Sequence, residues 1–229
     1  MNNPWLKLPK MPPFILKIDR PAIGNLNSQF KEKRKEESLI RDTIIPEPFV
    51  GNPFTASVVV LNLNPGLEES DEQWHQTPAF RQAALDNLEH RRMDYPFYLL
   101  DPRFKASGGA VYWRKRFRTL IEKYGDRAVA QAICVVEWHP YHSVKSRGHP
   151  EDKFCDSQDY NFWLVTQAIE RGACIVCLRS RSRWEKVLPK GHKLNTVNSS
   201  QAAYLTQNNT CLGLWKRINA KICSHGGGM

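Results

Sequence analysis

The segment Val58–Gly66 constrains the fold more than any other part of the chain. It reads VVVLNLNPG, an apolar and mostly β-branched run that ends in a polar turn. Such a run is typical of a parallel strand that is covered on both faces, as in α/β proteins. Alternation along the strand places Asn62 and Asn64 on one face at its carboxyl end. Pro65 disfavours helix at Asn64, and Gly66 lets a ligand approach the backbone, so we expect a binding site here.

Other strand and helix patterns alternate along the chain. The sequence predicts further strands at 131–136, 173–178 and 193–197, and helices at 78–90, 111–124, 157–171 and 212–222. This alternation predicts an α/β fold, a three-layer sandwich with a mostly parallel, four-stranded central sheet. Residues 93–110 form a long irregular connection, and loops of this length in compact domains usually work at a site.

The first part of the chain has a different character. Prolines alternate with apolar residues up to residue 18, and a charged helix is predicted from Asp19 to about Ser38. We expect residues 1–44 to form an N-terminal arm and helix packed on the body, and residues 45–229 to form the α/β domain. The basic residues between 31 and 35 are interleaved with acidic ones, which favours a solvated face over a phosphate contact.

The charge of the chain points to a polyanionic partner. The formal net charge is +10, which favours nucleic acid or an anionic membrane. No apolar run approaches the roughly 18 residues that a membrane-spanning helix needs, and the amino terminus has no apolar core of the signal-peptide type. We therefore expect DNA as the partner, no membrane association, and a monomeric protein in the cytoplasm.

The six cysteines do not form the pattern of a disulfide scaffold. Cys174 and Cys177 have the spacing of a metal motif, but a strand would aim them at opposite faces. Together with Cys155 and Cys211 they would complete a four-thiolate iron–sulfur set. We favour the alternative, in which the thiols are small core residues, and we expect no metal and no cofactor.

The strand that ends in Asn64, Pro65 and Gly66 resembles the first motif of the uracil-DNA glycosylase superfamily, especially its mismatch-specific branch. In that branch glycine, an apolar residue, Asn, Pro and Gly stand in this order. The later elements, to about residue 223, follow a similar order, and Asn198-Ser199-Ser200 stands where the branch has Asn, Pro and Ser. The missing proline, and the absence of the histidine that other branches use there, are departures from the pattern. The resemblance implies a uracil-DNA glycosylase-like fold.

The resemblance also implies an activity, the hydrolysis of the bond between a base and its deoxyribose after the nucleotide leaves the stack. Asn64 stands at the position that holds the attacking water, and an amide orients water without taking its proton. The predicted catalytic residues are Asn64, Asn62, Glu68 and His139. The predicted base-binding residues are Glu137, Pro65, Gly66, Phe97 and Tyr98. The predicted DNA-binding residues are Asn198, Ser199, Ser200, Tyr204, Arg114, Arg116, Lys145 and Arg147.

Glu137 stands where the uracil enzymes use an Asn to read the base. An ionised carboxylate only accepts hydrogen bonds, which suits the amino group of cytosine. We therefore expect a modified cytosine to be preferred over uracil, with the 93–110 loop admitting a bulky substituent. The alternative is a structural role, in which Glu137 pairs with an Arg or with His139.

Three functions stay open at this point. The first is a monofunctional DNA glycosylase that leaves an abasic site, because no lysine stands in the motif positions to form a Schiff base. The second is a catalytically silent nucleic-acid-binding module on the same fold. The third is a metal-dependent nuclease that uses His139, His142 and Glu137. The first reading leaves open whether the substrate is damaged host DNA, in repair, or modified foreign DNA, as in defence against phage.

Overall fold

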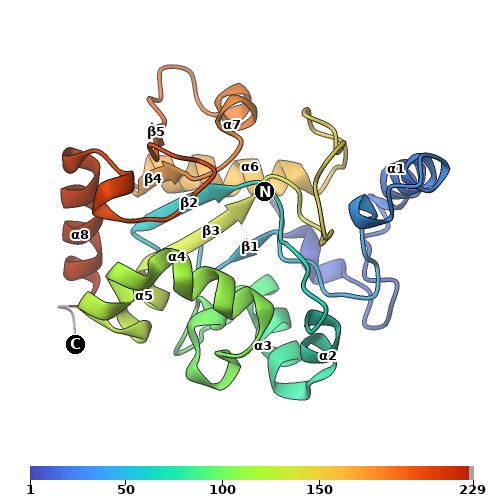
Figure 1. Ribbon diagram of the computed structural model, residues 1–229, viewed down its shortest axis with the longest axis horizontal. Coiled ribbons are helices and arrows are strands. Elements are labelled where there is room, and N and C mark those ends of the chain that lie inside the picture. Colours follow the sequence, from blue (N-terminus) through green and yellow to red (C-terminus); the bar gives the residue numbers. More distant parts are fainter. Residues whose placement is uncertain (227–229) are drawn as a thin grey trace.

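The computed structural model of the protein describes residues 1–226 and has a five-stranded sheet at its centre (Figure 1). The strand order is β1-β3-β2-β4-β5, with β1 antiparallel to β3 and the other neighbours parallel. The strands are β1 Phe49–Val50, β2 Val58–Asn62, β3 Ile133–Glu137, β4 Cys174–Cys177 and β5 Asn195–Thr196. β2 is central and buried along its whole length, as its β-branched run predicts.

Helices cover both faces of the sheet. α6 packs against β3 and β4 on one side, and α5 packs against β3 on the other (Figure 1). The helices are α1 Arg20–Glu32, α2 Asp71–Gln76, α3 Pro78–Leu88, α4 Gly108–Tyr124, α5 Asp126–Ala132, α6 Gln158–Glu170, α7 Arg181–Val187 and α8 Leu212–Gly226. Single turns of 3-10 helix lie at Pro4–Lys7, Glu36–Ser38, Tyr98–Leu100, Pro102–Phe104 and Gln207–Asn209. The predicted α/β class, with a mostly parallel sheet between helices, is confirmed.

The predicted number of strands is wrong by one. β1 is two residues long and lies between Pro48 and Gly51, in a segment that the sequence presents as a proline-rich connection. A strand this short has no alternation to detect. It adds an antiparallel edge to the four predicted strands, next to β3.

Several helix boundaries also differ from the prediction. The helix predicted to about Ser38 ends at Glu32, and Arg34 just beyond it has a left-handed backbone with φ 52°. α3 ends at Leu88, shortly before His90 with φ 57°. The sequence does not predict α2 or α5, because helices of one to two turns carry too little of the helical period.

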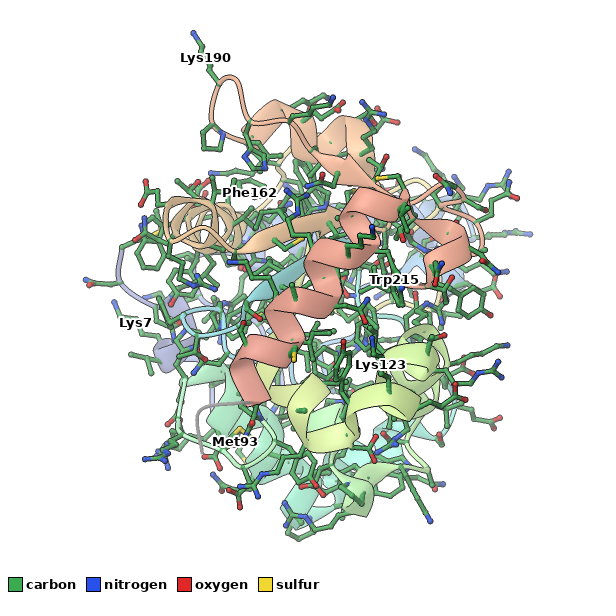
Figure 2. The ribbon with its side chains drawn as sticks, turned by 90° about the vertical axis from the view of Figure 1, so that its left-hand side faces the viewer. Lys7, Met93, Lys123, Phe162, Lys190 and Trp215 are labelled. Carbon is green, nitrogen blue, oxygen red and sulfur yellow. The ribbon has the colours of Figure 1, made fainter. Side chains whose placement is uncertain are left out.

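Helix α8, near the carboxyl terminus, packs against α4, α5 and the strands β2 and β4. Figure 2 shows it in the foreground, with Trp215 on it and Lys123 of α4 to its side. Trp215 is buried, and Lys123 Nζ donates to Asn219 Oδ1 at 2.8 Å. No helix within residues 1–226 combines the length and the apolar character that crossing a bilayer requires.

The N-terminal segment packs on the segment that follows β3. Asp19 is fully buried and accepts two hydrogen bonds, from Tyr141 Oη at 2.7 Å and from the Ser157 amide at 3.1 Å. The same Tyr141 oxygen accepts from the Leu16 amide at 3.2 Å. One buried carboxylate therefore joins the arm, the loop after β3 and the start of α6.

A second contact braces the loop 142–149. The Lys145 amide donates to Glu37 O at 2.7 Å, and the Arg41 amide donates to His142 O at 2.9 Å. Ser38 adds two hydrogen bonds to the same loop, one through its hydroxyl and one through its carbonyl. The conformation of this loop thus depends on residues more than 100 positions earlier in the chain.

We predict that Asp19→Ala lowers the free energy of unfolding by about 2–4 kcal/mol, because it leaves two buried donors without an acceptor. Urea denaturation of the full chain measures this change. Glu37→Ala is the control, since the Glu37 side chain is 60% exposed in its pair with Lys145 and such pairs contribute about 0–1 kcal/mol. Equal losses for the two variants would show that Asp19 does not hold the arm in place.

Candidate functional site

A cavity of about 490 Å³ lies where β2 and β3 end. Its wall combines the turn after β2, helix α2, the first turns of α4, and the loop after β3. Both strands run in the same direction, so their carboxyl ends meet at one edge of the sheet, which is the usual ligand site of such sheets. The sequence-based prediction of a site at the end of the Val58 strand agrees with this cavity.

Asn62 and Glu137 form the floor of the cavity. They are paired neighbours in the β2–β3 register, so both side chains leave the sheet on the same face. Asn62 Nδ2 donates to Glu137 Oε1 at 3.0 Å. The other two polar atoms, Asn62 Oδ1 and Glu137 Oε2, are buried without a partner. The floor therefore contains two side-chain oxygen atoms that have no hydrogen-bond partner.

The pKa of Glu137 is raised to about 8, mainly because burial disfavours the charged form. The negative charge of Glu47 acts in the same direction, while the hydrogen bond from Asn62 and the charges of Arg179 and Arg116 oppose it. At neutral pH the carboxyl group is therefore mostly protonated. The ionised carboxylate expected from the sequence is the minor form, and Glu137 pairs with Asn62 rather than with an Arg or His139.

The turn after β2 supplies a second amide. Asn64 is half buried and lines the cavity with Pro65 and Gly66. Its Nδ2 atom is held by Pro65 O at 3.0 Å and by Ser143 Oγ at 3.3 Å. These contacts leave Asn64 Oδ1 as an acceptor. Asn62 and Asn64 thus line the same cavity, although β2 ends at Asn62 and its alternation does not reach Asn64.

One side of the cavity carries a buried group that the sequence does not predict. Glu47, His75 and His142 all line the cavity and are all buried. His142 Nδ1 lies 2.7 Å from Gly66 O, and its Nε2 lies 3.9 Å from Glu47 Oε2. The Tyr98 hydroxyl donates to the other carboxylate oxygen of Glu47. These residues come from three distant segments, so only the folded chain brings them together.

Charged residues surround the rest of the cavity. Glu68 and Asp71 line it next to α4, and Asp71 Oδ2 accepts from the Glu68 amide at 2.7 Å. The predicted DNA contacts Lys145 and Arg147 also line it, and both are exposed. Arg179 joins them and was not predicted; its Nε atom is buried without a partner. Lys145, Arg147 and Glu68 are thus exposed in the wall, Asp71 is buried and Arg179 is half buried.

Three of the predicted catalytic and base-binding residues do not line the cavity. His139 lies outside it, where its Nε2 accepts from Arg183 at 2.8 Å. Phe97 and Tyr98 are fully buried in the core, so neither offers a face to a base. Aromatic residues that do line the cavity are Phe80, Tyr112 and Trp113. The helical spacing of α4 identifies Trp113 as buried, but it does not show which buried aromatic residue borders a cavity.

The other predicted DNA contacts lie away from the cavity wall. The exposed loop Asn198–Ser200 is tied to Asn209, which accepts from the Asn198 amide through its carbonyl and from the Ser199 amide through Oδ1, both at 2.8 Å. Arg114 forms an ion pair with Asp126 at 2.8 Å.

Arg116 lies over the ring of Tyr112, with 3.1 Å from its guanidinium carbon to the ring centroid, and near the ring of Tyr204 at 5.8 Å. Arg116 and Tyr204 therefore support the cavity wall from behind, through Tyr112. Contact of this group and of the 198–200 loop with DNA stays a prediction.

The two metal-binding sets that the sequence left as alternatives do not assemble within residues 1–226. Cys155, Cys174 and Cys177 are buried and Cys211 is exposed, and all four are free thiols. Within residues 1–226, the group of His, Cys, Asp and Glu side chains close enough to hold a metal ion is Glu47, His75 and His142. The combination of His139, His142 and Glu137 proposed for a nuclease is not such a group.

Comparisons with known proteins add no relative. No family model, curated protein or solved structure matches this chain. The resemblance to uracil-DNA glycosylases therefore depends on the motif residues named above, and it stays a prediction.

We predict that Glu137→Gln stabilises the protein at pH 7 by up to about 3 kcal/mol and flattens its pH dependence. In the native state Glu137 stays protonated up to a pKa of about 8, whereas in the unfolded state it ionises near its ordinary pKa of 4.5. The unfolded state therefore binds fewer protons between these values, and stability falls as pH rises through this window, by about 1.4 kcal/mol per unit. Glutamine keeps the acceptor for Asn62 and does not ionise.

Urea denaturation of both proteins between pH 5 and 8.5 measures this difference. Glu122→Gln is the matched control, because the Glu122 side chain is 64% exposed in its pair with Arg118. A difference between Glu137→Gln and the unsubstituted protein that stays constant across this pH range would contradict the raised pKa.

Proposed function

We propose that the protein is a monofunctional DNA glycosylase that hydrolyses the N-glycosidic bond of a flipped-out pyrimidine and leaves an abasic site. The observation that carries the proposal is the meeting of Asn62, Asn64 and Glu137 in one cavity at the end of β2 and β3. Typical ligand pockets enclose about 300–1,000 Å³, and this cavity falls within that range. A pyrimidine ring fills only part of it, which leaves room for a substituent.

The floor supports a preference for a modified cytosine over uracil. Because Glu137 Oε1 accepts from Asn62, the unpartnered Oε2 is the oxygen that carries the proton and faces a ligand. Cytosine has an unprotonated ring nitrogen, N3, that can take this proton, whereas N3 of uracil carries a hydrogen. The adjacent Asn62 Oδ1 accepts from the exocyclic amino group. This reading replaces the ionised carboxylate of the sequence-based hypothesis with a neutral acid.

The proposed reaction accounts for the proton that the base gains and for the proton that the water loses. When the bond between C1′ of the sugar and N1 of the base breaks, its electron pair passes to the base, and the Glu137 proton moves to N3. Water held by Asn64 Oδ1 adds to C1′ and releases a proton to solvent, from which Glu137 is protonated again. Glu68, in the cavity wall, is the carboxylate that assists this water. His139 has no part, because it lies outside the cavity.

The rim of the cavity supports DNA as the substrate. Lys145 and Arg147 are exposed in the cavity wall, Arg179 is half buried in it, and the chain has a formal net charge of +10. Cations in this position bind backbone phosphates on either side of an extruded nucleotide. The acidic interior accepts the neutral base rather than a phosphate. The arrangement therefore separates the two chemical parts of a nucleotide.

We predict that Asn64→Ala lowers the single-turnover rate of base release by about 10²–10⁴-fold while the affinity for DNA is retained, because the amide orients the water. Duplexes that contain uracil, thymine opposite guanine, cytosine or substituted cytosines are the substrates, and mass spectrometry identifies the free base. Asn25→Ala, on the exposed face of α1, is the control.

Rapid release of uracil that Glu137→Gln does not change would contradict the base preference. Binding without release of any base, from these duplexes or from genomic DNAs with different modifications, would favour the silent nucleic-acid-binding module instead.

We also predict that the rate of base release falls about tenfold per pH unit above pH 8. The acid must be protonated to act, and the pKa of Glu137 is about 8. Glu137→Gln cannot donate this proton, so its rate is lower by about 10²–10⁴-fold and loses the alkaline decline. A decline of equal slope in both proteins would assign it to another group.

A further inference from the structure

Three buried residues converge on one side of the cavity from separate parts of the chain. Glu47 precedes β1, His75 lies in α2, and His142 lies in the loop after β3. One potential ligand atom from each lies within 4.8 Å of the other two. We propose that Glu47, His75 and His142 bind a divalent transition-metal ion of the zinc class, with an open coordination position facing the cavity. This proposal does not depend on the glycosylase reaction.

The hydrogen bond of His142 fixes which nitrogen is free to bind. His142 Nδ1 lies 2.7 Å from Gly66 O, and a carbonyl oxygen only accepts, so Nδ1 carries a hydrogen. Nε2 is buried without a hydrogen-bond partner. A backbone carbonyl that holds one ring nitrogen while the other remains free is the usual arrangement around a metal-binding histidine.

The contacts of Glu47 and His75 complete the site. The buried Tyr98 hydroxyl donates to Glu47 Oε1, which leaves Oε2 for an ion. His75 is 6% exposed, and its Nδ1 is buried without a partner. The rings of His75 and His142 meet edge to face at a centroid distance of 5.5 Å. Glu47 and His142 are thus each held by a hydrogen bond, and His75 packs against the ring of His142 with its Nδ1 unpaired.

The distance between His142 Nε2 and Glu47 Oε2 suits a bridging metal ion better than a direct hydrogen bond. His142 Nε2 and Glu47 Oε2 are 3.9 Å apart, which is too long for a hydrogen bond. Two electron-rich atoms buried at this distance are stabilised by a cation bound to both. Ligand atoms around a tetrahedral ion with bonds of about 2.0–2.2 Å are about 3.4 Å apart, so closure by about 0.5 Å brings this pair into position.

The ligand types select the class of metal. Two imidazoles and one carboxylate are typical of catalytic zinc sites and of non-haem iron(II) sites. Calcium and magnesium prefer oxygen ligands throughout. Three protein ligands leave at least one position open, and all three residues line the cavity, so the open position faces a bound molecule. Asp71, also in this wall, accepts from the Glu68 amide and is not one of the three.

Cobalt(II) titration of the full chain tests the proposal. The protein carries Cys211→Ser and Cys223→Ser, because these exposed thiols bind metals themselves. After removal of metals with a chelator, we expect one Co²⁺ per chain with the strong visible absorption of low coordination number, displaced by Zn²⁺. Bound metal also raises the melting temperature, by an amount that grows with the logarithm of the ratio of free metal to its dissociation constant.

Glu47→Gln, His75→Asn and His142→Gln are each expected to weaken Co²⁺ binding by about a hundredfold or more. His139→Gln is the matched control, a buried histidine outside the cavity that should bind as the parent does. Circular dichroism shows whether each variant folds. Absence of stoichiometric binding in the parent, or binding that persists in all three folded ligand variants, would overturn the site and leave a metal-free pair of Glu47 and His142. Because the readout is absorption, neither result decides the glycosylase proposal.

Discussion

The in-register pairing of β2 with β3 is the interaction on which the rest of the site depends. It sets Asn62 beside Glu137 at the point where both strands end, and it does so inside the sheet, where water does not reach. The backbone carbonyl of Asn62 accepts hydrogen bonds from the Trp184 indole at 2.8 Å and from the Trp138 amide at 3.2 Å. Two polar atoms stay unpaired on this rigid floor, and each costs about 1–3 kcal/mol. Proteins keep buried polar atoms without a partner mainly at sites that bind a ligand or catalyse a reaction.

Charges of both signs line the cavity. The net charge of the chain is +10, yet Glu47, Asp71 and Glu137 are buried in the cavity wall, whereas Lys145 and Arg147 are exposed in it. The separation of signs is partial, because Glu68 is exposed and Arg179 is half buried. Under the proposed function, phosphates bind the exposed cations and the base binds the buried acidic groups. The composition shows only the sum of these charges, whereas the fold shows where each of them lies.

The sequence predicts features that depend on neighbouring residues better than features that depend on contacts between distant segments. The central strand and the α/β class follow from local patterns, and the structure agrees with both. Asn62 and Asn64 line one cavity, although β2 ends at Asn62 and strand alternation does not extend to Asn64. Glu47 and His75 could not be predicted, because nothing within their own segments links them to His142. The protonation of Glu137 depends on burial by many segments together. Phe97 was misplaced for a related reason, since irregular segments show no period that separates a core aromatic residue from a cavity aromatic residue.

The bracing of the loop 142–149 by residues 37–41 has a consequence for how the chain can be divided. That loop carries His142, Lys145 and Arg147 into the cavity wall, and its backbone is tied to the segment that precedes β1. A fragment cloned from residue 45 onward would keep every strand but lose this support. Any chimera or shortened version of the protein should therefore keep residues 1–44 together with the sheet.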